Sequence, residues 1–523
     1  MKITKALAFT GILGILTSLI SGCAQTAATS VVSTYTTNAS ETTKTIPAVT
    51  TNTSIIASPT HSSITTTSAL PSSSVYPTVQ IALQPDKAGI NIPADFLGVS
   101  YEAPVLAGNY FDINNNVYIN LLHNLGNGVL RFGGNSVEFT YWSRTPGKTF
   151  PNSRAVLLPS DLDRLFAFAN KTNWHVILGL NLGANNPTMA ADEAAYAWQV
   201  GKNSITGFEV GNEPDLYARN GLRSTTYTYT DFHQEFTRYL QSIQVKIPNA
   251  PIAGPVTAYN YEWFSNFLKD EKNNVVLSTQ HLYPLSASSA LKPTDASYAT
   301  IDKLLSAAAA QRTINSIQQF ENAAKANNLP LRYAETNSAS SGGKDGVSNA
   351  FASALWGADY LFNLAENGVV GVNFHGGFST HGYTPIGLDK NNQYTAMPLY
   401  YAMLLFHDAA QGRIIPLDMN TAANVTAHAV LGNDGTLHLV IINKDATEAC
   451  NAQINPGKSY SRAGALRLTA PSLESQNGVT FGGSAVAPDG TWSGGEEETV
   501  TQNSTGYHIV VSAASAVAIT FRE

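Results

Sequence analysis

The sequence predicts an α/β protein: a (β/α)8 TIM barrel over residues 96–404, followed by an all-β sandwich domain over residues 405–523. Eight short β-rich runs alternate with helical patterns, as parallel strands with helical crossovers do. Nearly every run ends in polar side chains, and in a barrel these strand ends meet at one mouth. After about residue 405 the helical patterns give way to short β runs separated by turn residues, which is typical of a sandwich.

The first segment, residues 1–23, has the pattern of an export signal. Two lysines precede an apolar run that is short for a bilayer span of about 20 residues. Ile20-Ser21-Gly22-Cys23 resembles the bacterial lipoprotein box, in which cleavage leaves the cysteine as a lipidated N-terminus. We therefore expect an exported bacterial lipoprotein, held through Cys23 in the outer membrane and periplasm or at the cell surface. An uncleaved anchor helix is the alternative.

Residues 24–77 form a Ser/Thr-rich linker whose only charged side chains are Glu41 and Lys44. A segment of this composition cannot bury enough apolar surface to fold, so we expect it to be disordered. Residues 78–95 contain a β run, Val79–Leu83, that is expected to join the sandwich.

The barrel strands and several of its helices follow from local pattern. The eight β runs are Phe96–Ala103, Val129–Asn135, His175–Gly183, Ile205–Pro214, Ile252–Ala258, Val275–Pro284, Leu331–Ser338 and Val369–Gly377. Helical segments between them include Leu162–Lys171, Thr230–Val245, Tyr298–Asn327 and Ser348–Asn367. A doubly wound sheet is the alternative, but the sequence has no Gly-rich phosphate-binding fingerprint.

The sandwich is predicted from alternating runs near the C-terminus. They are Val425–Leu431, Leu437–Asn443, Tyr507–Ser512 and Ser515–Phe521, and Asn433-Asp434-Gly435 between the first two is a hairpin signal.

Composition excludes several classes of protein. With 30 Lys and Arg against 37 Asp and Glu, the 523-residue chain has a net charge of −7, unlike a protein that binds nucleic acid. Two cysteines cannot form a disulfide framework or a four-cysteine zinc site. Because Cys23 is expected to carry lipid, Cys450 is expected to be a buried, small apolar residue. No metal motif is present, and we expect neither a metal site nor a cofactor.

Two glutamates stand out among the polar residues at the strand ends. Glu213 ends the fourth run within Gly211-Asn212-Glu213-Pro214, and Glu335 ends the seventh within Ala334-Glu335-Thr336-Asn337. Strands four and seven face each other across a barrel mouth. A pair of carboxylates about 5 Å apart is what a retaining glycosidase needs, one as nucleophile and the other as acid/base.

These motifs give the sequence a family resemblance. Asn-Glu-Pro after strand four with a second Glu after strand seven resembles the clan of retaining (β/α)8 glycosidases. Further motifs resemble glycoside hydrolase family 79, the β-glucuronidases and heparanase, over residues 79–523. They are Ser100-Tyr101-Glu102, Leu130-Arg131-Phe132-Gly133-Gly134-Asn135, and Glu335-Thr336-Asn337-Ser338 followed by Gly342-Gly343.

The resemblance implies roles for individual residues. Glu213 matches the acid/base and Glu335 the nucleophile. Asn212 matches a residue that holds the sugar 2-hydroxyl, Glu102 one that binds sugar hydroxyls, and Tyr283 one that hydrogen-bonds the nucleophile.

In this family the glucuronate carboxylate is held by a Gly pair and a Tyr, which Gly342, Gly343 and Tyr383 match. Arg131 is expected to orient the nucleophile side of the pocket, because a buried Arg needs carboxylate partners, and Asn135 to support it. His281 and His375 either line the pocket or hold the barrel rim. Lys344 either contacts substrate or is a solvated loop residue, and Trp142 either stacks on a sugar or packs under its loop.

The sequence therefore predicts a monomeric glycoside hydrolase, a retaining exo-β-glucuronidase that removes terminal β-linked glucuronic acid or 4-O-methylglucuronic acid from glycans. A retaining β-glycosidase for other sugars and an endo-acting, heparanase-like hydrolase are alternatives. A non-catalytic carbohydrate-binding surface lipoprotein is a third.

Overall fold

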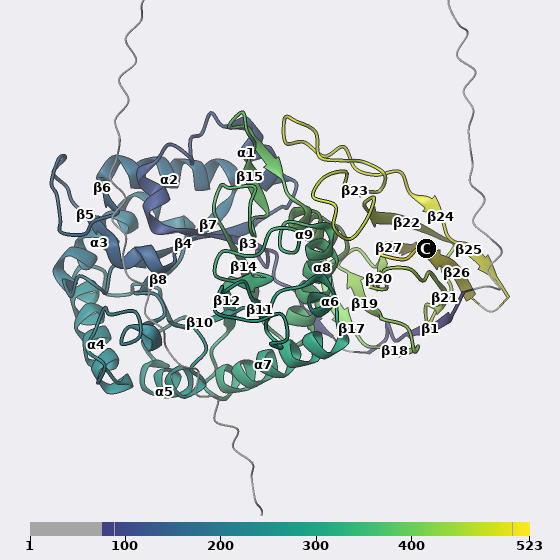
Figure 1. Ribbon diagram of the computed structural model, residues 1–523, viewed down its shortest axis with the longest axis horizontal. Helices are drawn as coiled ribbons and strands as arrows, with labels where there is room; N and C mark the ends of the chain where they lie inside the picture. The colour runs from purple at the N-terminus through teal and green to yellow at the C-terminus, as the bar shows by residue number, and fades with distance from the viewer. Residues whose placement is uncertain (1–75, 88, 505) are drawn as a thin grey trace, which may run out of the picture. The chain divides into compact units, whose positions relative to one another are not determined.

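The computed structural model describes residues 76–87, 89–504 and 506–523 (Figure 1). The predicted export signal, Cys23 and nearly all of the linker lie outside the described residues. Eight parallel strands close into a barrel in the order β10-β12-β14-β3-β4-β7-β8-β9, which confirms the predicted fold class. These strands are β3 (Gly98–Glu102), β4 (Gly128–Gly133), β7 (Trp174–Leu180), β8 (Ile205–Val210), β9 (Ile252–Thr257), β10 (Leu277–Leu282), β12 (Leu331–Thr336) and β14 (Gly371–Gly376).

Two strand pairs that share β12 are irregular beside the mouth. The register between β10 and β12 shifts at Gln280 and His281, so that His281 lies opposite Glu335. The register between β12 and β14 shifts between Tyr333 and Thr336. Such bulges re-aim side chains and occur preferentially next to active sites. Here they affect the strand that carries Glu335.

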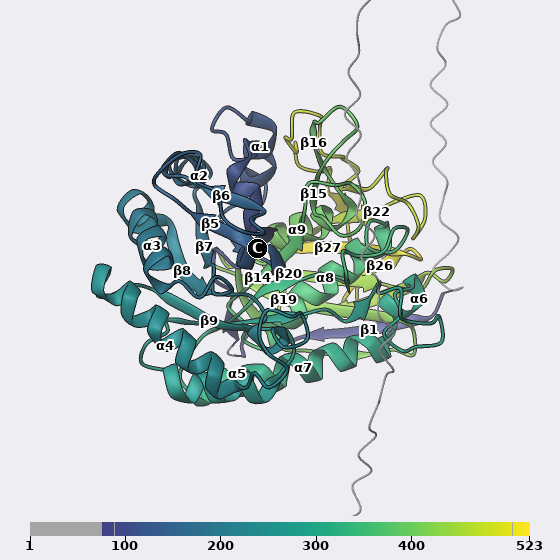
Figure 2. The ribbon, with the colours of Figure 1, turned by 60° about the vertical axis from the view of Figure 1, so that its left-hand side comes forward.

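Helices surround the strands, as both ribbon views show (Figures 1 and 2). They are α1 (Asn116–His123), α2 (Pro159–Thr172), α3 (Pro187–Gly201), α4 (Tyr229–Lys246), α5 (Tyr261–Glu271), α6 (Ile301–Leu304), α7 (Ala307–Ala326), α8 (Phe351–Glu366) and α9 (Pro398–Ala409). The single helix predicted over Tyr298–Asn327 was wrong, because Ser306 caps a new helix by accepting a hydrogen bond from the Ala309 N–H. Within the described ranges no helix is long and apolar enough to span a membrane.

The C-terminal part of the chain forms two sheets with apolar side chains between them. One contains β2 (Ile90–Asn91), β17 (Gly412–Ile415), β19 (Val425–Gly432), β20 (Leu437–Asn443), β22 (Arg462–Thr469), β23 (Thr480–Phe481), β24 (Glu498–Thr499) and β27 (Ser515–Arg522). The other contains β1 (Thr78–Leu83), β18 (Leu417–Asn420), β21 (Cys450–Asn455), β25 (Thr501–Asn503) and β26 (Gly506–Val511). Val79, Ile81, Leu439 and Ile519 are among the core residues they share.

The N-terminal strand ties the start of the described chain to this domain. β1 pairs antiparallel with β18 and parallel with β21. Cys450, at the start of β21, is buried, and burial raises the pKa of its thiol to about 11. A thiol in this state is a small apolar core group rather than a nucleophile.

A buried charge cluster joins the barrel to the eight-stranded sheet. His428 of β19 contacts Glu366 (Nδ1 to Oε1, 2.7 Å) and Asp359 (Nε2 to Oδ1, 3.0 Å) of α8. Lys444 Nζ donates to the other Asp359 oxygen at 2.8 Å. Burial lowers the pKa of His428, but the charge of Glu366 and the hydrogen bonds to both carboxylates outweigh it and raise the pKa to about 9. The two carboxylates and two cations compensate one another in a site where His428, Asp359 and Lys444 are buried and Glu366 is partly exposed.

This cluster makes stability depend on pH. The pKa of His428 is about 9 in the folded state and about 6.5 in an unfolded chain, so its contribution is complete below pH 6.5 and is lost as pH rises through 9. We expect His428→Gln to lower the free energy of unfolding at pH 6 by about 3 kcal/mol and to flatten its decline between pH 6.5 and 9. Thermal unfolding between pH 6 and 9 measures the free energy of unfolding and its decline with pH. His438→Gln is the control, because burial lowers the pKa of His438 to about 4, and an equal flattening in both variants would refute the assignment.

Candidate active site

A cavity of about 700 Å³ opens at the carboxyl ends of the barrel strands. Residues from nearly every part of the barrel line it. The predicted site residues among them are Glu102, Asn135, Glu213, His281, Tyr283, Glu335, Gly342, His375 and Tyr383. Arg131 and Asn212 lie beneath these residues, with exposed fractions of 0% and 2%. Gly343 lies behind the lining, against Tyr383, where a Cβ would come within 2.7 Å of the Tyr383 backbone nitrogen.

The two glutamates approach each other across this cavity. Glu335 is the penultimate residue of β12, and Glu213 follows β8 at the start of the short 3-10 helix η4 (Pro214–Leu216). A carboxylate oxygen of Glu213, one of Glu335 and a ring nitrogen of His281 all lie within 4.8 Å of one another. Glu213 has a φ of 51°, which is rare for a residue with a side chain. Its N–H is fixed by a 2.9 Å bond to the Val256 carbonyl.

Arg131 of β4 connects the groups beneath the cavity. Its Nε donates to Glu209 Oε2 at 2.7 Å, and one Nη donates to Glu335 Oε2, also at 2.7 Å. The other Nη donates to Asn212 Oδ1 at 3.0 Å and lies 3.3 Å from His281 Nε2. One guanidinium therefore fixes both the nucleophile candidate and the residue that precedes Glu213.

The Gly133-Gly134 pair at the end of β4 leaves room for these side chains. A Cβ on Gly133 would lie 2.6 Å from Arg131 Nη2, and one on Gly134 would lie 2.5 Å from the Glu102 carboxyl group. Real Cβ atoms do not approach that closely. The two glycines after Arg131 are therefore required because a side chain at either position would collide with Arg131 or Glu102.

Glu335 is surrounded by donors and positive charge. Tyr283 donates its hydroxyl hydrogen to Oε1 at 2.9 Å, while Arg131 occupies Oε2. Burial raises the pKa of Glu335, but the charges of His375 and Arg131 outweigh it and hold the pKa far below its usual range. An ionised carboxylate with one face toward a cavity is suited to act as a nucleophile.

Glu213 has a different partner. His281, with a side chain 0% exposed, places Nδ1 at 3.0 Å from Glu213 Oε1. Because Arg131 can only donate, His281 Nε2 must accept from it, which leaves the hydrogen on Nδ1 to donate to Glu213. The Glu213 carboxyl group is thus oriented by a neutral imidazole.

Glu102, His375 and Tyr383 form a further part of the cavity wall. Glu102 accepts from the Ser136 N–H at 2.8 Å and from the Ser136 hydroxyl, and His375 Nε2 lies 3.7 Å from its other oxygen. His375 Nδ1 pairs with Ser100 Oγ at 2.9 Å. Burial lowers the pKa of His375, but the charges of Glu335 and Glu102 raise it overall. Tyr383 stacks on Tyr283 with ring centroids 5.9 Å apart.

Two buried glutamates that were not among the predicted site residues complete the site. Glu209 of β8 is 0% exposed and forms an ion pair with Arg131. Glu138 is 2% exposed and accepts from the Asn212 N–H at 2.8 Å, the Gly183 N–H at 2.5 Å and the Tyr217 hydroxyl. Burial raises the pKa of Glu138 to about 7 against these hydrogen bonds. Glu138 therefore fixes the backbone beside Glu213.

Trp142 and Lys344 do not line the cavity. Trp142 is 3% exposed and donates Nε1 to Asp192 at 2.8 Å, so it packs under its loop. Lys344 Nζ donates to the Ala299 carbonyl at 3.1 Å and lies 3.8 Å from the ring centroid of Tyr298, so it ties two loops together.

The only metal-ligand geometry found among the described residues is the group Glu213, His281 and Glu335. The Arg131 guanidinium, 2.7 Å from Glu335, opposes a second cation there. The site instead holds two carboxyl groups, each of which has its own set of hydrogen-bond and charge partners.

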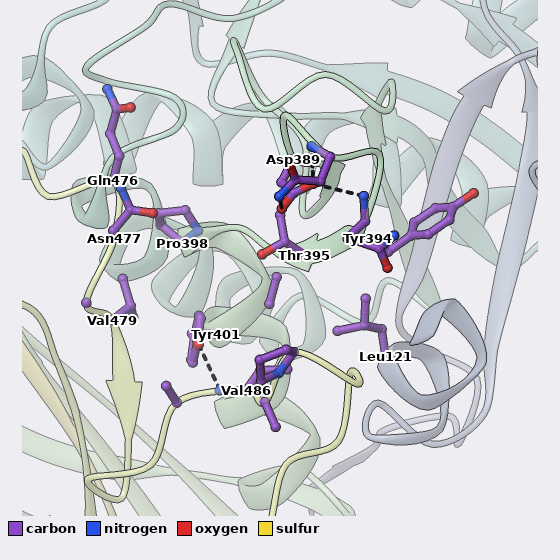
Figure 3. Close-up of a pocket in the computed structure, with 17 residues that line it drawn as sticks. Leu121, Asp389, Tyr394, Thr395, Pro398, Tyr401, Gln476, Asn477, Val479 and Val486 are labelled. Atoms are coloured by element: carbon purple, nitrogen blue, oxygen red, sulfur yellow. Dashed lines mark hydrogen bonds between the residues drawn. The ribbon is translucent and has the colours of Figure 1, made fainter. Parts of the chain in front are cut away.

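A second cavity, of about 530 Å³, lies beside the hairpin of β15 (Ile386–Leu388) and β16 (Tyr394–Ala396) and the loop over residues 476–488 (Figure 3). Asp389 is already bonded within its own loop, to the N–H groups of Asn391 at 2.8 Å and Gln393 at 2.9 Å. Tyr401 accepts from the Val486 N–H at 3.0 Å. The described residues that line this cavity include no carboxylate pair and no nucleophile with a base.

The chain matches a known family in both of its folded parts. Residues 115–362 match the N-terminal domain of glycosyl hydrolase family 79, and residues 427–518 match the C-terminal β domain of that family. A β-glucuronidase of Aspergillus niger is 25% identical over 404 residues, which cover 69% of this chain and 73% of that protein. Heparanase-like protein 3 of Arabidopsis thaliana is 22% identical, over 67% of this chain and 68% of that one.

A solved structure shares the fold. The 4-O-α-L-rhamnosyl-β-D-glucuronidase of Fusarium oxysporum 12S superposes with a TM-score of 0.71 at 20% identity. The match covers 85% of this chain and all of that one. At this level of identity the comparison supports the architecture alone.

Replacing Glu138 tests its positioning role. Glu138→Gln keeps the shape but turns an amide NH2 toward backbone N–H donors, so we expect kcat to fall about tenfold with little change in KM. Steady-state kinetics on an aryl glycoside measure this. Glu193→Gln is the matched control, since Glu193 is also buried but lies on α3 outside the cavity. Equal kcat values for the two variants would refute the role.

His375 is expected to influence the acid limb of the pH profile. Its positive charge favours ionised Glu335, so His375→Gln should raise the pKa of Glu335. The acid limb of kcat/KM then moves to higher pH, by about one unit. His381→Gln in the loop after β14 is the control, because His381 is 80% exposed and pairs with Asp345 instead. An acid limb that stays in place, or moves to lower pH, would contradict this electrostatic account.

Proposed function

The chain belongs to glycosyl hydrolase family 79 and is a glycoside hydrolase, and we propose that it is a retaining exo-β-glucuronidase. Its substrates in this proposal are glycans that end in β-linked glucuronic acid or 4-O-methylglucuronic acid. The observation that carries the retaining mechanism is the short separation of Glu213 and Glu335, whose nearest carboxylate oxygens lie within 4.8 Å. Retaining enzymes hold their carboxyl groups about 5 Å apart, whereas inverting enzymes leave about 6.5–9.5 Å for a water molecule.

The first step forms a covalent intermediate. Glu335 Oε attacks the anomeric carbon as the bond to the leaving oxygen breaks, and Glu213 gives its proton to that oxygen. Arg131 and Tyr283 each hold one Glu335 oxygen. These contacts keep the nucleophile ionised and aimed at the cavity. As Glu335 loses its charge to the new bond, Arg131 remains paired with Glu209.

The second step releases the sugar. Glu213, now a carboxylate, takes a proton from water, and the water oxygen attacks the anomeric carbon. The bond to Glu335 breaks, and the carboxylate returns to its partners. His281 donates to Glu213 and keeps its orientation through both steps. Two inversions at the same carbon leave the β configuration unchanged.

Recognition of glucuronate is proposed at the wall that contains Gly342 and Tyr383. Both line the cavity, and a hydrogen bond from the Gly342 backbone partly offsets the rise that burial causes in the pKa of Tyr383, so the amide and the hydroxyl are neighbours. Together they offer neutral donors to a carboxylate. The proposed glucuronate site agrees with the β-glucuronidase names of the relatives described above.

We also propose export and lipid anchoring through Cys23, supported by the Ile20-Ser21-Gly22-Cys23 box. Labelling of the full chain with a fatty-acid analogue in a bacterial host tests it. Labelling that is absent from wild type, or that persists in Cys23→Ala, would refute the anchor.

The proposed activity is tested with 4-nitrophenyl glycosides and proton NMR. Wild type should hydrolyse the β-D-glucuronide much faster than the β-D-glucoside or β-D-xyloside, and the first product seen by NMR should be the β anomer. Glu335→Gln and Glu213→Gln should lower turnover by about 10³-fold or more, because each removes a group that bonds with the reacting atoms. Glu262→Gln on α5 is the control for a surface glutamate.

Other outcomes point to other functions. Activity on neutral sugars alone would overturn the glucuronidase, and the α anomer as first product would overturn retention. Turnover only of internal bonds in a polymer would favour an endo-acting enzyme. Unchanged activity in Glu335→Gln would refute the assigned nucleophile.

A further inference from the structure

The catalytic cavity has two chemically different halves. Residues of β3, β12 and β14, and of the segments that follow β4, β12 and β14, supply the wall with Glu102, His375 and Tyr383. The other half comes from the segments after β8 and β9 and from α7, with side chains that the hydrolytic steps leave unused. They are Leu216, Arg219, Asn220, Tyr259, Ser316, Gln319 and Phe320.

Part of this second half belongs to the chain segment that carries the proposed acid/base. Leu216, Arg219 and Asn220 belong to the segment that begins with Glu213, the residue that protonates the departing oxygen. In the proposed mechanism the acid stands on the side of the sugar from which the leaving group departs, so these side chains are placed to meet that group rather than the glucuronate.

Arg219 is a cation without a counterion. It is exposed, and among the residues that the structure describes no carboxylate forms an ion pair with it. By contrast, Arg223 in the next turn pairs with Glu235 at 3.0 Å. Among the described residues, Arg219 is also the only Lys or Arg that lines this cavity. In a chain of net charge −7, an unpaired guanidinium in the cavity that contains Glu213 and Glu335 is a specific feature.

Tyr259 supplies a flat surface at the same mouth. Its side chain is 64% exposed although the residue is large and aromatic. Its backbone is held rigidly, since Asp215 accepts from the N–H groups of Ala258 at 2.9 Å, Tyr259 at 3.3 Å and Asn260 at 3.1 Å. Asp215 lies between Glu213 and Arg219 in the chain. It therefore clamps the Tyr259 loop to the segment that carries both of them.

We propose that Arg219 and Tyr259 form a leaving-group subsite that accepts a ring bearing a carboxylate. Tyr259 packs against the ring, as exposed aromatic residues do in ligand sites. The planar guanidinium of Arg219 offers paired donors that match a carboxylate. Asn220 and Gln319 add neutral donors and acceptors beside it. The inference rests on the proposed glucuronidase activity and adds the chemical class of the group released.

The test compares two substrates that differ in one charge. They are 4-carboxyphenyl β-D-glucuronide and 4-carbamoylphenyl β-D-glucuronide, assayed with wild type and Arg219→Gln. The variant should lose about ten times more kcat/KM on the carboxyphenyl than on the carbamoylphenyl substrate, mainly through KM, as expected for loss of one charge-assisted hydrogen bond. Salt should reduce the wild-type preference.

Controls separate the charge from its position. Arg219→Lys should keep part of the preference, and Arg413→Gln, which removes an exposed charge on β17, should keep all of it. Tyr259→Ala should lower kcat/KM on both substrates by about fivefold through lost stacking.

Each outcome decides between the proposals. Equal losses on the two substrates in Arg219→Gln overturn this subsite and leave the glucuronidase standing. No release of either phenol by wild type overturns the glucuronidase, and the subsite fails with it. An equal loss of preference in Arg413→Gln shows a general charge effect and also overturns the subsite.

Discussion

Arg131 lies entirely out of contact with water, and its guanidinium is shared by Glu209, Glu335 and Asn212. Removing a charge from water costs several kcal/mol, which only well-placed partners offset. The rest of the site follows from this constraint. Two glycines leave space beside the guanidinium, Glu209 balances its charge, and Glu335 must be ionised to pair with it. The contact between Arg131 and Glu335 that fixes the nucleophile therefore also helps to balance the buried charge beneath the cavity.

The two catalytic carboxyl groups differ because their neighbours differ. Glu335 is surrounded by Arg131, His375 and Tyr283, a set of donors that favours the charged form. Glu213 meets a neutral imidazole and stands on a strained backbone held by Val256. A bulge in β12, where Ala334 has no partner on β10, places Glu335 opposite His281, and His281 also contacts Glu213. The proposed division into nucleophile and acid/base rests on this asymmetry.

Much of this arrangement could be predicted from sequence. The eight barrel strands were predicted because buried parallel strands are short β-rich runs, and Glu213 and Glu335 because they ended two of those runs. Glu138 was not predicted, since its role depends on Asn212 and Tyr217, which meet it only in the folded chain. Glu209 was likewise read as part of a strand. The break at Ser306 was missed because the helical pattern continues on both sides of its cap. The proposed role of Arg219 could not be predicted from sequence, because it depends on the absence of an ion-pair partner in the folded chain.

The central claim is that Glu335, held by Arg131 and Tyr283, forms a covalent bond to the sugar. The most direct measurement is mass spectrometry of the protein after treatment with 2-deoxy-2-fluoro-β-D-glucuronosyl fluoride, whose fluorine slows release of the intermediate. The account predicts one added sugar, located by peptide mapping on Glu335. A sugar bound to another residue, or no adduct on a protein that hydrolyses glucuronides, would contradict it.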